Sequence, residues 1–223
     1  MQTQNENNTS KKKEKVKDRD IREPLFCFLE ETYGNIRIIE EKFAGDSSAD
    51  VVMIMKDSIC GIEIKSDADT YARLASQVKD YDKYFDYNFA AVGSSHAGSI
   101  EEHVPEYWGI ITIDTDEDGN LDFYILRHPK KNPNATVAKQ LTILWRPELA
   151  RIQEAHVLPA YNYLSKANVR KKILERIPFD ELHADICYTL MNRDYTTIAE
   201  EINKYREEAG RKKRRRKKKR KPK

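Results

Sequence analysis

The sequence predicts an α/β protein with a central mixed β-sheet flanked by helices, followed by a C-terminal helical appendage and a basic tail. Short β-branched runs at 36–43, 51–55 and 59–65 precede a helical pattern at 70–85, an alternation typical of α/β folds. From residue 136 the apolar spacing is helical. With 223 residues, the chain is long enough to form a core without disulfides or metals as staples.

The charge is distributed unevenly between the body of the chain and its end. Residues 211–223 hold 12 of the 40 Lys and Arg residues and no acid. The rest therefore has 28 basic and 37 acidic residues, a net charge of −9. We expect the tail, rather than the fold, to supply long-range attraction to nucleic acid. A solvated terminus with adventitious contacts is the alternative interpretation.

The first predicted helix begins at Asp20. Asp20 and Glu23 have the spacing of a capping box, Pro24 fits a first turn, and Gly34 ends the helix. Its apolar stripe comprises Ile21, Leu25, Phe28 and Leu29. The preceding residues are polar and Lys-rich, which predicts a disordered arm.

Strands and one further helix follow in order. The predicted elements are a strand at 35–43, a loop at 44–48, a hairpin of strands at 51–55 and 59–65, a helix at 70–85, and strands at 89–93, 108–113 and 121–126. The acidic run 114–120 superficially resembles a calcium loop. It lacks the flanking helix pair and the closing Glu of such a loop, so we expect a hairpin turn.

Charges in the third strand indicate a site. Glu63 and Lys65 share one face of the strand 61–65, because side chains alternate across a strand. Charges on an apolar strand are costly to bury unless they meet partners or a metal. Asp50, at the start of the preceding strand, is the nearest expected partner. Asp50, Glu63 and the backbone carbonyl of Ile64 would form an all-oxygen site for a hard cation such as Mg²⁺. An exposed edge strand with a surface salt bridge is the structural alternative.

Asp50, followed after twelve residues by Glu63-Ile64-Lys65, resembles the active-site motif of the PD-(D/E)XK, or restriction-endonuclease-like, nuclease superfamily. The next predicted helix carries Gln77-Val78-Lys79-Asp80-Tyr81, which resembles the Gln-x-x-x-Tyr motif of the recombination and phage-exonuclease branch. The resemblance covers roughly residues 20–128, and the segments 63–70 and 104–109 are similar to a bacterial and phage subgroup of uncharacterised or DNA-repair-associated members. Ala49 stands where the family has Pro, a departure that removes no ligand.

The resemblance implies a restriction-endonuclease-like core and a role for each motif residue. The two carboxylates and the Ile64 carbonyl would hold Mg²⁺ or Mn²⁺, which lowers the pKa of a water and draws charge from the phosphate. Lys65 would orient or deprotonate that water or stabilise the developing charge. Gln77 would hold the water or the phosphate, and Tyr81 would contact the DNA backbone.

Four further residues are candidates for supporting roles. Glu23 and Glu41 are candidate auxiliary acids of the metal site, and a helix cap is an equally good interpretation of Glu23. Asp69 and Arg73, at i and i+4, predict an ion pair at the helix start, with a substrate phosphate contact by Arg73 as the alternative.

The domain organisation follows from these elements. We predict a disordered polar arm, a nuclease core, a helical appendage and a disordered polybasic tail at residues 1–19, 20–130, 131–208 and 209–223. By composition, 129–134 is a linker. The run 196–202 fits the helix of a helix-turn-helix DNA reader, although we prefer a small helical cap packed on the core.

Cysteines and hydropathy indicate the compartment. Cys27, Cys60 and Cys187 form no close pair and lie in apolar surroundings, which predicts buried, reduced thiols. No apolar run is long enough for a membrane span or a signal core, so we expect a soluble, cytoplasmic protein.

Together these features predict a Mg²⁺- or Mn²⁺-dependent deoxyribonuclease of bacterial or phage DNA repair, recombination or defence. Both an exonuclease and a structure-selective endonuclease fit. A catalytically inactive nucleic-acid-binding scaffold of the same fold is one alternative, and a protein-interaction module that uses the acidic body is another. DNA is the expected partner, and a homodimer or a partner protein is compatible with the sequence.

Overall fold

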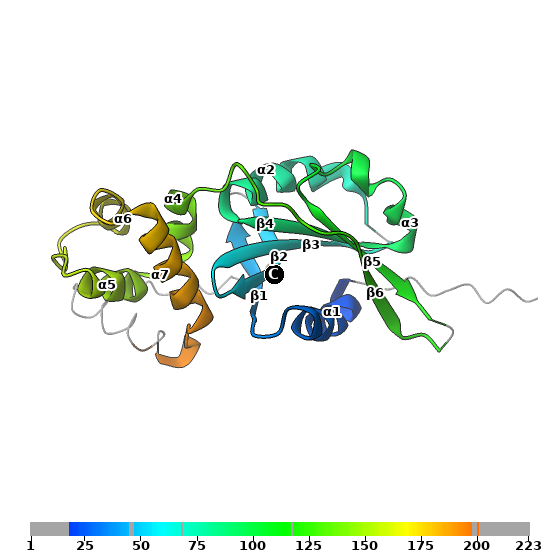
Figure 1. The fold of residues 1–223 in the computed structure, drawn as a ribbon, viewed down its shortest axis with the longest axis horizontal. Coiled ribbons are helices and arrows are strands. Elements are labelled where there is room, and N and C mark those ends of the chain that lie inside the picture. The colour runs from blue at the N-terminus through cyan, green and yellow to red at the C-terminus, as the bar shows by residue number, and fades with distance from the viewer. Residues whose placement is uncertain (1–17, 45–46, 68, 117, 198–199, 201–223) are drawn as a thin grey trace, which may run out of the picture.

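A six-stranded mixed sheet forms the centre of the computed structural model, which describes residues 18–44, 47–67, 69–116, 118–197 and 200 (Figure 1). The strands are β1 (Arg37–Ala44), β2 (Ser47–Met55), β3 (Ser58–Lys65), β4 (Tyr87–Gly93), β5 (Gly109–Thr115) and β6 (Leu121–Arg127). They lie side by side in chain order. The pairs β3–β4 and β4–β5 are parallel, and the other pairs are antiparallel. The predicted fold class is therefore confirmed.

The two hairpins at the start of the sheet have short turns. Met55 pairs with Ser58 across the predicted hairpin of β2 and β3. Ala44 pairs with Ser47 across β1 and β2, so strand pairing extends into the loop that the sequence predicts at 44–48. The predicted loop was therefore too long, because Ala44, Ser47 and Ser48 belong to strands. Residues 45–46 lie outside the described part of the chain.

Side-chain alternation along the strands divides the apolar residues between two helices, α1 (Asp18–Tyr33) on one face of the sheet and α2 (Leu74–Tyr84) on the other (Figure 1). The cluster under α1 includes Ile21, Leu25 and Leu29 of the helix with Val51, Met53, Ile62 and Ala91 of the strands. The cluster under α2 includes Leu74, Val78, Tyr81 and Phe85 with Val52, Ile54, Ile59 and Val92.

Helix α1 begins at Asp18, before the predicted start at Asp20. Ile21 is packed into the core, and Pro24 lies inside the helix rather than in its first turn. The helix ends as predicted at Gly34, whose φ of 73° lets its N–H donate to the carbonyl of Glu30.

The segment between β3 and β4 forms the parallel crossover that positions the site. The predicted helix at 70–85 begins as a 3₁₀ turn, η1 (Tyr71–Arg73), and continues as α2. After β4 come α3 (Ser94–Ala97) and η2 (Ile100–Glu102). Between β5 and β6, the exposed Asp116 carboxylate accepts the N–H groups of Asp118 and Asn120, as in the predicted hairpin turn.

Helices follow the sheet, as predicted from residue 136 onward. They are α4 (Val137–Gln140), η3 (Leu141–Ile143), α5 (Arg146–Ala155), α6 (Lys166–Leu174) and α7 (Phe179–Met191). The helix-turn-helix interpretation falls largely on residues 198–199 and 201–202, which lie outside the described residues, as do the tail and residues 1–17 of the predicted arm. The domain boundaries stay a prediction.

These helices are fastened to the sheet at the C-terminal end of α2. The Asp86 carboxylate accepts hydrogen bonds from the Ile59 N–H at 2.8 Å, from Gln140 of α4 at 2.9 Å and from His183 of α7 at 2.9 Å. The Asn132 side chain donates to two carbonyls at the end of α2, so the predicted linker at 129–134 is held against that end of the helix.

Charge strengthens this junction. The hydrogen bonds of His183 to Asp86 and to the Cys187 thiol raise the pKa of the imidazole to about 10. His183 is therefore a cation paired with the Asp86 carboxylate at neutral pH.

The cysteines are free thiols, and the structure corrects one of them. Cys60 and Cys187 are buried as predicted, but Cys27 is exposed, because the buried stripe of α1 runs through other positions of the helix. Within the described ranges, no helix combines the length and the apolar character that a membrane span requires.

Candidate active site

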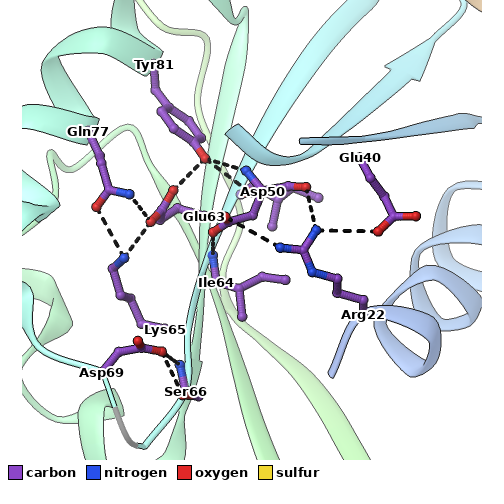
Figure 2. A network of polar contacts seen from close by, with 11 residues as sticks. Arg22, Glu40, Asp50, Glu63, Ile64, Lys65, Ser66, Asp69, Gln77 and Tyr81 are labelled. Atoms are coloured by element: carbon purple, nitrogen blue, oxygen red, sulfur yellow. Dashed lines mark hydrogen bonds and ion pairs between the residues drawn. The ribbon is translucent and has the colours of Figure 1, made fainter. Parts of the chain in front are cut away.

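Glu63, near the end of β3, is the centre of a cluster of polar side chains (Figure 2). Its carboxylate lies on the face of the sheet covered by α2 and is only 1% exposed. Oε1 accepts hydrogen bonds from Lys65 Nζ at 2.5 Å and from the Gln77 amide. Oε2 accepts the hydroxyl proton of Tyr81 at 2.6 Å. The motif residues that the sequence predicts on β3 and α2 are therefore in direct contact.

Helix α2 positions the two non-charged donors of this cluster. Gln77 and Tyr81 are four residues apart, so both face the sheet one turn from each other. The Gln77 amide also accepts from Lys65 Nζ at 3.2 Å, so it bonds the ammonium through its oxygen and the carboxylate through its nitrogen. Gly61 makes this close approach of α2 feasible, because a Cβ there would lie 2.3 Å from the Phe85 ring and 2.8 Å from Tyr81.

Asp50 joins the cluster from β2. The pairing of Val51 with Ile62 brings Asp50 beside Glu63 at the end of the hairpin. Asp50 Oδ2 accepts the Ile64 N–H at 3.0 Å. The backbone N–H of Asp50 donates to the Tyr81 hydroxyl at 3.1 Å, and the same hydroxyl donates to Glu63. Tyr81 thus connects the two carboxylate-bearing strands.

The environment of Tyr81 fixes it as a neutral donor. Burial, with the charges of Glu63 and Asp50 nearby, raises the pKa of the phenol well above its usual value. The side chain is fully buried. The DNA contact predicted for Tyr81 does not fit this placement, because the hydroxyl is enclosed between the two strands and bonded to the site itself.

The third predicted metal ligand is the Ile64 carbonyl. In a strand, the N–H and C=O of one residue point to the same side. Because the Ile64 N–H is bonded by Asp50, the carbonyl of that residue is also directed toward β2. Together with the two carboxylates, this carbonyl would give a donor set of oxygens only, the kind of set that Mg²⁺ and Mn²⁺ accept.

The capacity of Glu63 is compatible with such an ion. A carboxylate oxygen accepts about two hydrogen bonds or ligands. Oε1 already has two donors, Lys65 and Gln77, whereas Oε2 has the single donor Tyr81 and keeps room for one ligand. Across the described ranges, no three His, Cys, Asp or Glu side chains group closely enough to hold a metal. Waters would therefore complete the coordination, as Mg²⁺ prefers.

Arg22 of α1 is a member of the site that the sequence analysis missed. Its Nη1 donates to the Asp50 carbonyl at 3.2 Å and to Glu40 of β1 at 3.4 Å, and its Nη2 lies 3.7 Å from Asp50 Oδ1 (Figure 2). Its side chain is 13% exposed. No sequence signal marks this residue, since it lies 28 positions before Asp50 in a charged helix.

Three further predicted residues are Glu23, Glu41 and Arg73, and no contact with the cluster is described for them. Glu23 is exposed on α1 and makes no hydrogen bond or ion pair with the cluster among the described residues. Glu41 lies in β1, but its side chain is outside the described part of the chain. Arg73 is exposed on η1. The ion pair predicted for it is wrong, because the Asp69 carboxylate instead accepts the N–H and hydroxyl of Ser66.

Comparisons with known proteins found a matching family model and a similar solved structure. A family model described as Bacteriophage P4 protein cII matches residues 38–217. A solved structure described as Pyrococcus furiosus SfsA in complex with Ca²⁺ aligns with a TM-score of 0.33 and 11% sequence identity. The alignment covers 51% of this chain and 63% of that chain, less than two thirds of its length. A comparison with curated proteins found no match.

Proposed function

The chain belongs to the bacteriophage P4 protein cII family, and we propose that it is a metal-dependent nuclease that hydrolyses DNA phosphodiester bonds. The observation that carries the proposal is the contact of Asp50, Glu63 and Lys65 with a Gln and a Tyr of α2 at one end of the sheet. These are the residues whose spacing resembles the PD-(D/E)XK and Gln-x-x-x-Tyr motifs. We propose a role in phage or bacterial DNA repair, recombination or defence.

The structural alternative of a surface salt bridge on an edge strand is wrong. β3 lies between β2 and β4, and the Glu63–Lys65 pair is buried. Burying an ion pair costs more desolvation free energy than an exposed pair does, and apolar residues of similar volume are often at least as stable. Burial of the pair is therefore weak evidence of a stabilising role, and its contacts with Gln77 and Tyr81 are what support a chemical role.

In the proposed site, Asp50, Glu63 and the Ile64 carbonyl would hold Mg²⁺ or Mn²⁺. Bound there, the ion would supply a water of lowered pKa and a positive charge against the phosphate. The protein's own side chains would have two further roles. They would hold the carboxylates in place, and they would present a proton donor or acceptor to the reacting atoms.

Lys65 is the residue that would act on those atoms. An ammonium has three N–H donors, and two of them are directed at Glu63 and Gln77. The third would bind a phosphate oxygen or the attacking water. Because Gln77 contacts both the ammonium and Glu63, its expected role is to keep Lys65 directed at the substrate, which refines the water-binding role predicted from the sequence.

A catalytically inactive scaffold of the same fold is the second candidate. The observation that favours it is charge compensation within the cluster, where Lys65 pairs with Glu63 and Arg22 lies beside Asp50. In that case the carboxylates would serve only to fasten β2, β3 and α2 together. DNA binding would then depend on other surfaces, including the basic residues at 211–223, and would weaken steeply with salt.

The experiment that separates these functions is a cleavage assay on linear, nicked and single-stranded DNA. Wild type, Lys65→Ala and the control Lys79→Ala, an exposed position of α2, are compared in Mg²⁺, Mn²⁺ and EDTA. We expect metal-dependent cleavage that Lys65→Ala lowers by about 100-fold or more, as is typical for loss of one group that stabilises developing charge. DNA binding without cleavage under every metal condition would favour the scaffold.

A further inference from the structure

Arg22 holds a charged position beside the proposed metal ligand Asp50. Its neighbours Ile21 and Leu25 are fully packed into the core, so the backbone of α1 at this point is fixed against the sheet. From there the guanidinium reaches between Asp50 and Glu40 (Figure 2). Its burial means that water screens its charge only weakly.

The charges of the cluster divide into two pairs. Lys65 is the counter-ion of Glu63, at 2.5 Å, and Arg22 is the cation beside Asp50, at 3.7 Å from Oδ1. Arginine stays charged at every pH that a protein tolerates. A divalent ion arriving at Asp50 therefore meets a positive charge that cannot be neutralised by proton loss.

We propose that Arg22 competes with the divalent ion for Asp50 and thereby sets the metal concentration at which the site fills. The inference rests on the proposed function, because it assigns the ion to Asp50. Two like charges a few ångströms apart repel strongly in a partly buried site. The ion binds when Arg22 withdraws toward Glu40 or solvent.

The opposite role, in which Arg22 holds Asp50 in place for the metal, is disfavoured by the other contacts of Asp50. The carboxylate is already fixed by the Ile64 N–H at 3.0 Å, and the backbone is fixed by the Tyr81 hydroxyl at 3.1 Å. Loss of Arg22 removes the repulsion and one hydrogen bond to the Asp50 carbonyl, but it leaves these two contacts intact. It also uncovers the negative charge of Glu40, which attracts the ion further.

The test is calorimetric titration of the full chain with Mn²⁺ alone, so that binding is measured without DNA or catalysis. The variants are Arg22→Gln, which removes the charge, and Arg22→Lys, which keeps it. Lys79→Gln serves as the matched control, because it removes one positive charge from an exposed position of α2. Asp50→Asn tests the ligand itself. Thermal unfolding of each variant checks that it is folded.

We expect Arg22→Gln to bind Mn²⁺ about tenfold more tightly than wild type, with Arg22→Lys and Lys79→Gln close to wild type and Asp50→Asn much weaker. Equal or weaker binding by Arg22→Gln, with Asp50→Asn still impaired, overturns the role of Arg22 and leaves the proposed metal site standing. If Asp50→Asn binds Mn²⁺ as wild type does, the ion lies elsewhere and both proposals fail.

Discussion

Glu63 and Asp86 are two buried carboxylates, and each accepts three hydrogen bonds. Glu63 lies near the end of β3, whereas Asp86 precedes β4 and binds the N–H of Ile59 near the start of β3. Their donors differ in kind. Asp86 is bonded by the backbone N–H of Ile59 and by side chains of two helices far along the chain, so its contacts explain how the helices are held to the sheet. Glu63 is bonded by side chains of its own strand and of α2, beside a second carboxylate. The contacts of Asp86 are architectural, whereas we propose that the contacts of Glu63 serve phosphodiester hydrolysis.

The comparison predicts the largest loss of stability at Asp86. Asp86→Ala leaves the Ile59 N–H, the Gln140 amide and the charged His183 without their acceptor. We expect the free energy of unfolding to fall by about 3–5 kcal/mol, as for breaking a buried ion pair. Urea denaturation measures it, with the exposed Asp122→Ala as control. A change no larger than that of the control would show that the helices are not held by Asp86.

Gly61→Ala is expected to destabilise the protein by up to about 3 kcal/mol, because the new Cβ forces α2 away from β3. The contact with Phe85 would be 2.3 Å. Gly98→Ala is the matched control, since nothing lies within 4 Å of its Cβ position. Thermal unfolding compares the two. Similar melting temperatures for both variants would contradict the close packing of α2 over the site.

The junction at Asp86 is expected to depend on pH. The folded pKa of His183, about 10, exceeds the unfolded value of about 6.5. Its stabilisation is therefore fully present below about pH 6.5 and is lost as the pH rises through about 10. We expect His183→Gln to be less stable than wild type by about 2 kcal/mol at pH 6 and to approach wild type near pH 10. Denaturation curves at both pH values measure the difference in free energy of unfolding between His183→Gln and wild type. The same difference at pH 6 and pH 10 would argue against the ion pair.

Tyr81→Phe is expected to have the smallest effect on stability. It keeps the ring in the core but removes one donor to Glu63 and one acceptor from the Asp50 N–H. We expect a loss of about 1 kcal/mol on urea denaturation. Cleavage should fall more clearly than stability, because both carboxylates lose the same positioning contact. Unchanged cleavage would remove Tyr81 from the proposed site.

Much of this arrangement was predictable from local patterns. The sheet and the crossover confirm what the strand runs and the helical spacing of 74–85 predicted, because both patterns depend on short-range periodicity. Glu63 and Lys65 share a face because they are two residues apart, and Gln77 and Tyr81 do so because they are four apart. Strand pairing then adds Asp50. The principal cluster therefore follows from spacing and one hairpin.

The missed features depend on how distant elements pack. Arg22 reaches Asp50 only because α1 lies against the sheet in one particular orientation, which no local pattern encodes. His183 meets Asp86 across 97 positions of the chain. Cys27 was wrongly predicted to be buried for a related reason. The rotation of α1 about its own axis decides which of its residues face the sheet, and composition alone does not give that rotation.

The most direct test of the account compares Glu63→Gln with Asp86→Asn, measuring the DNA cleavage rate in Mg²⁺ and the free energy of unfolding of each. We predict that Glu63→Gln folds and binds DNA but cleaves at least about 100-fold more slowly, whereas Asp86→Asn is destabilised yet still cleaves. Cleavage by Glu63→Gln at the wild-type rate would contradict the proposed nuclease site and leave Glu63, like Asp86, a structural carboxylate.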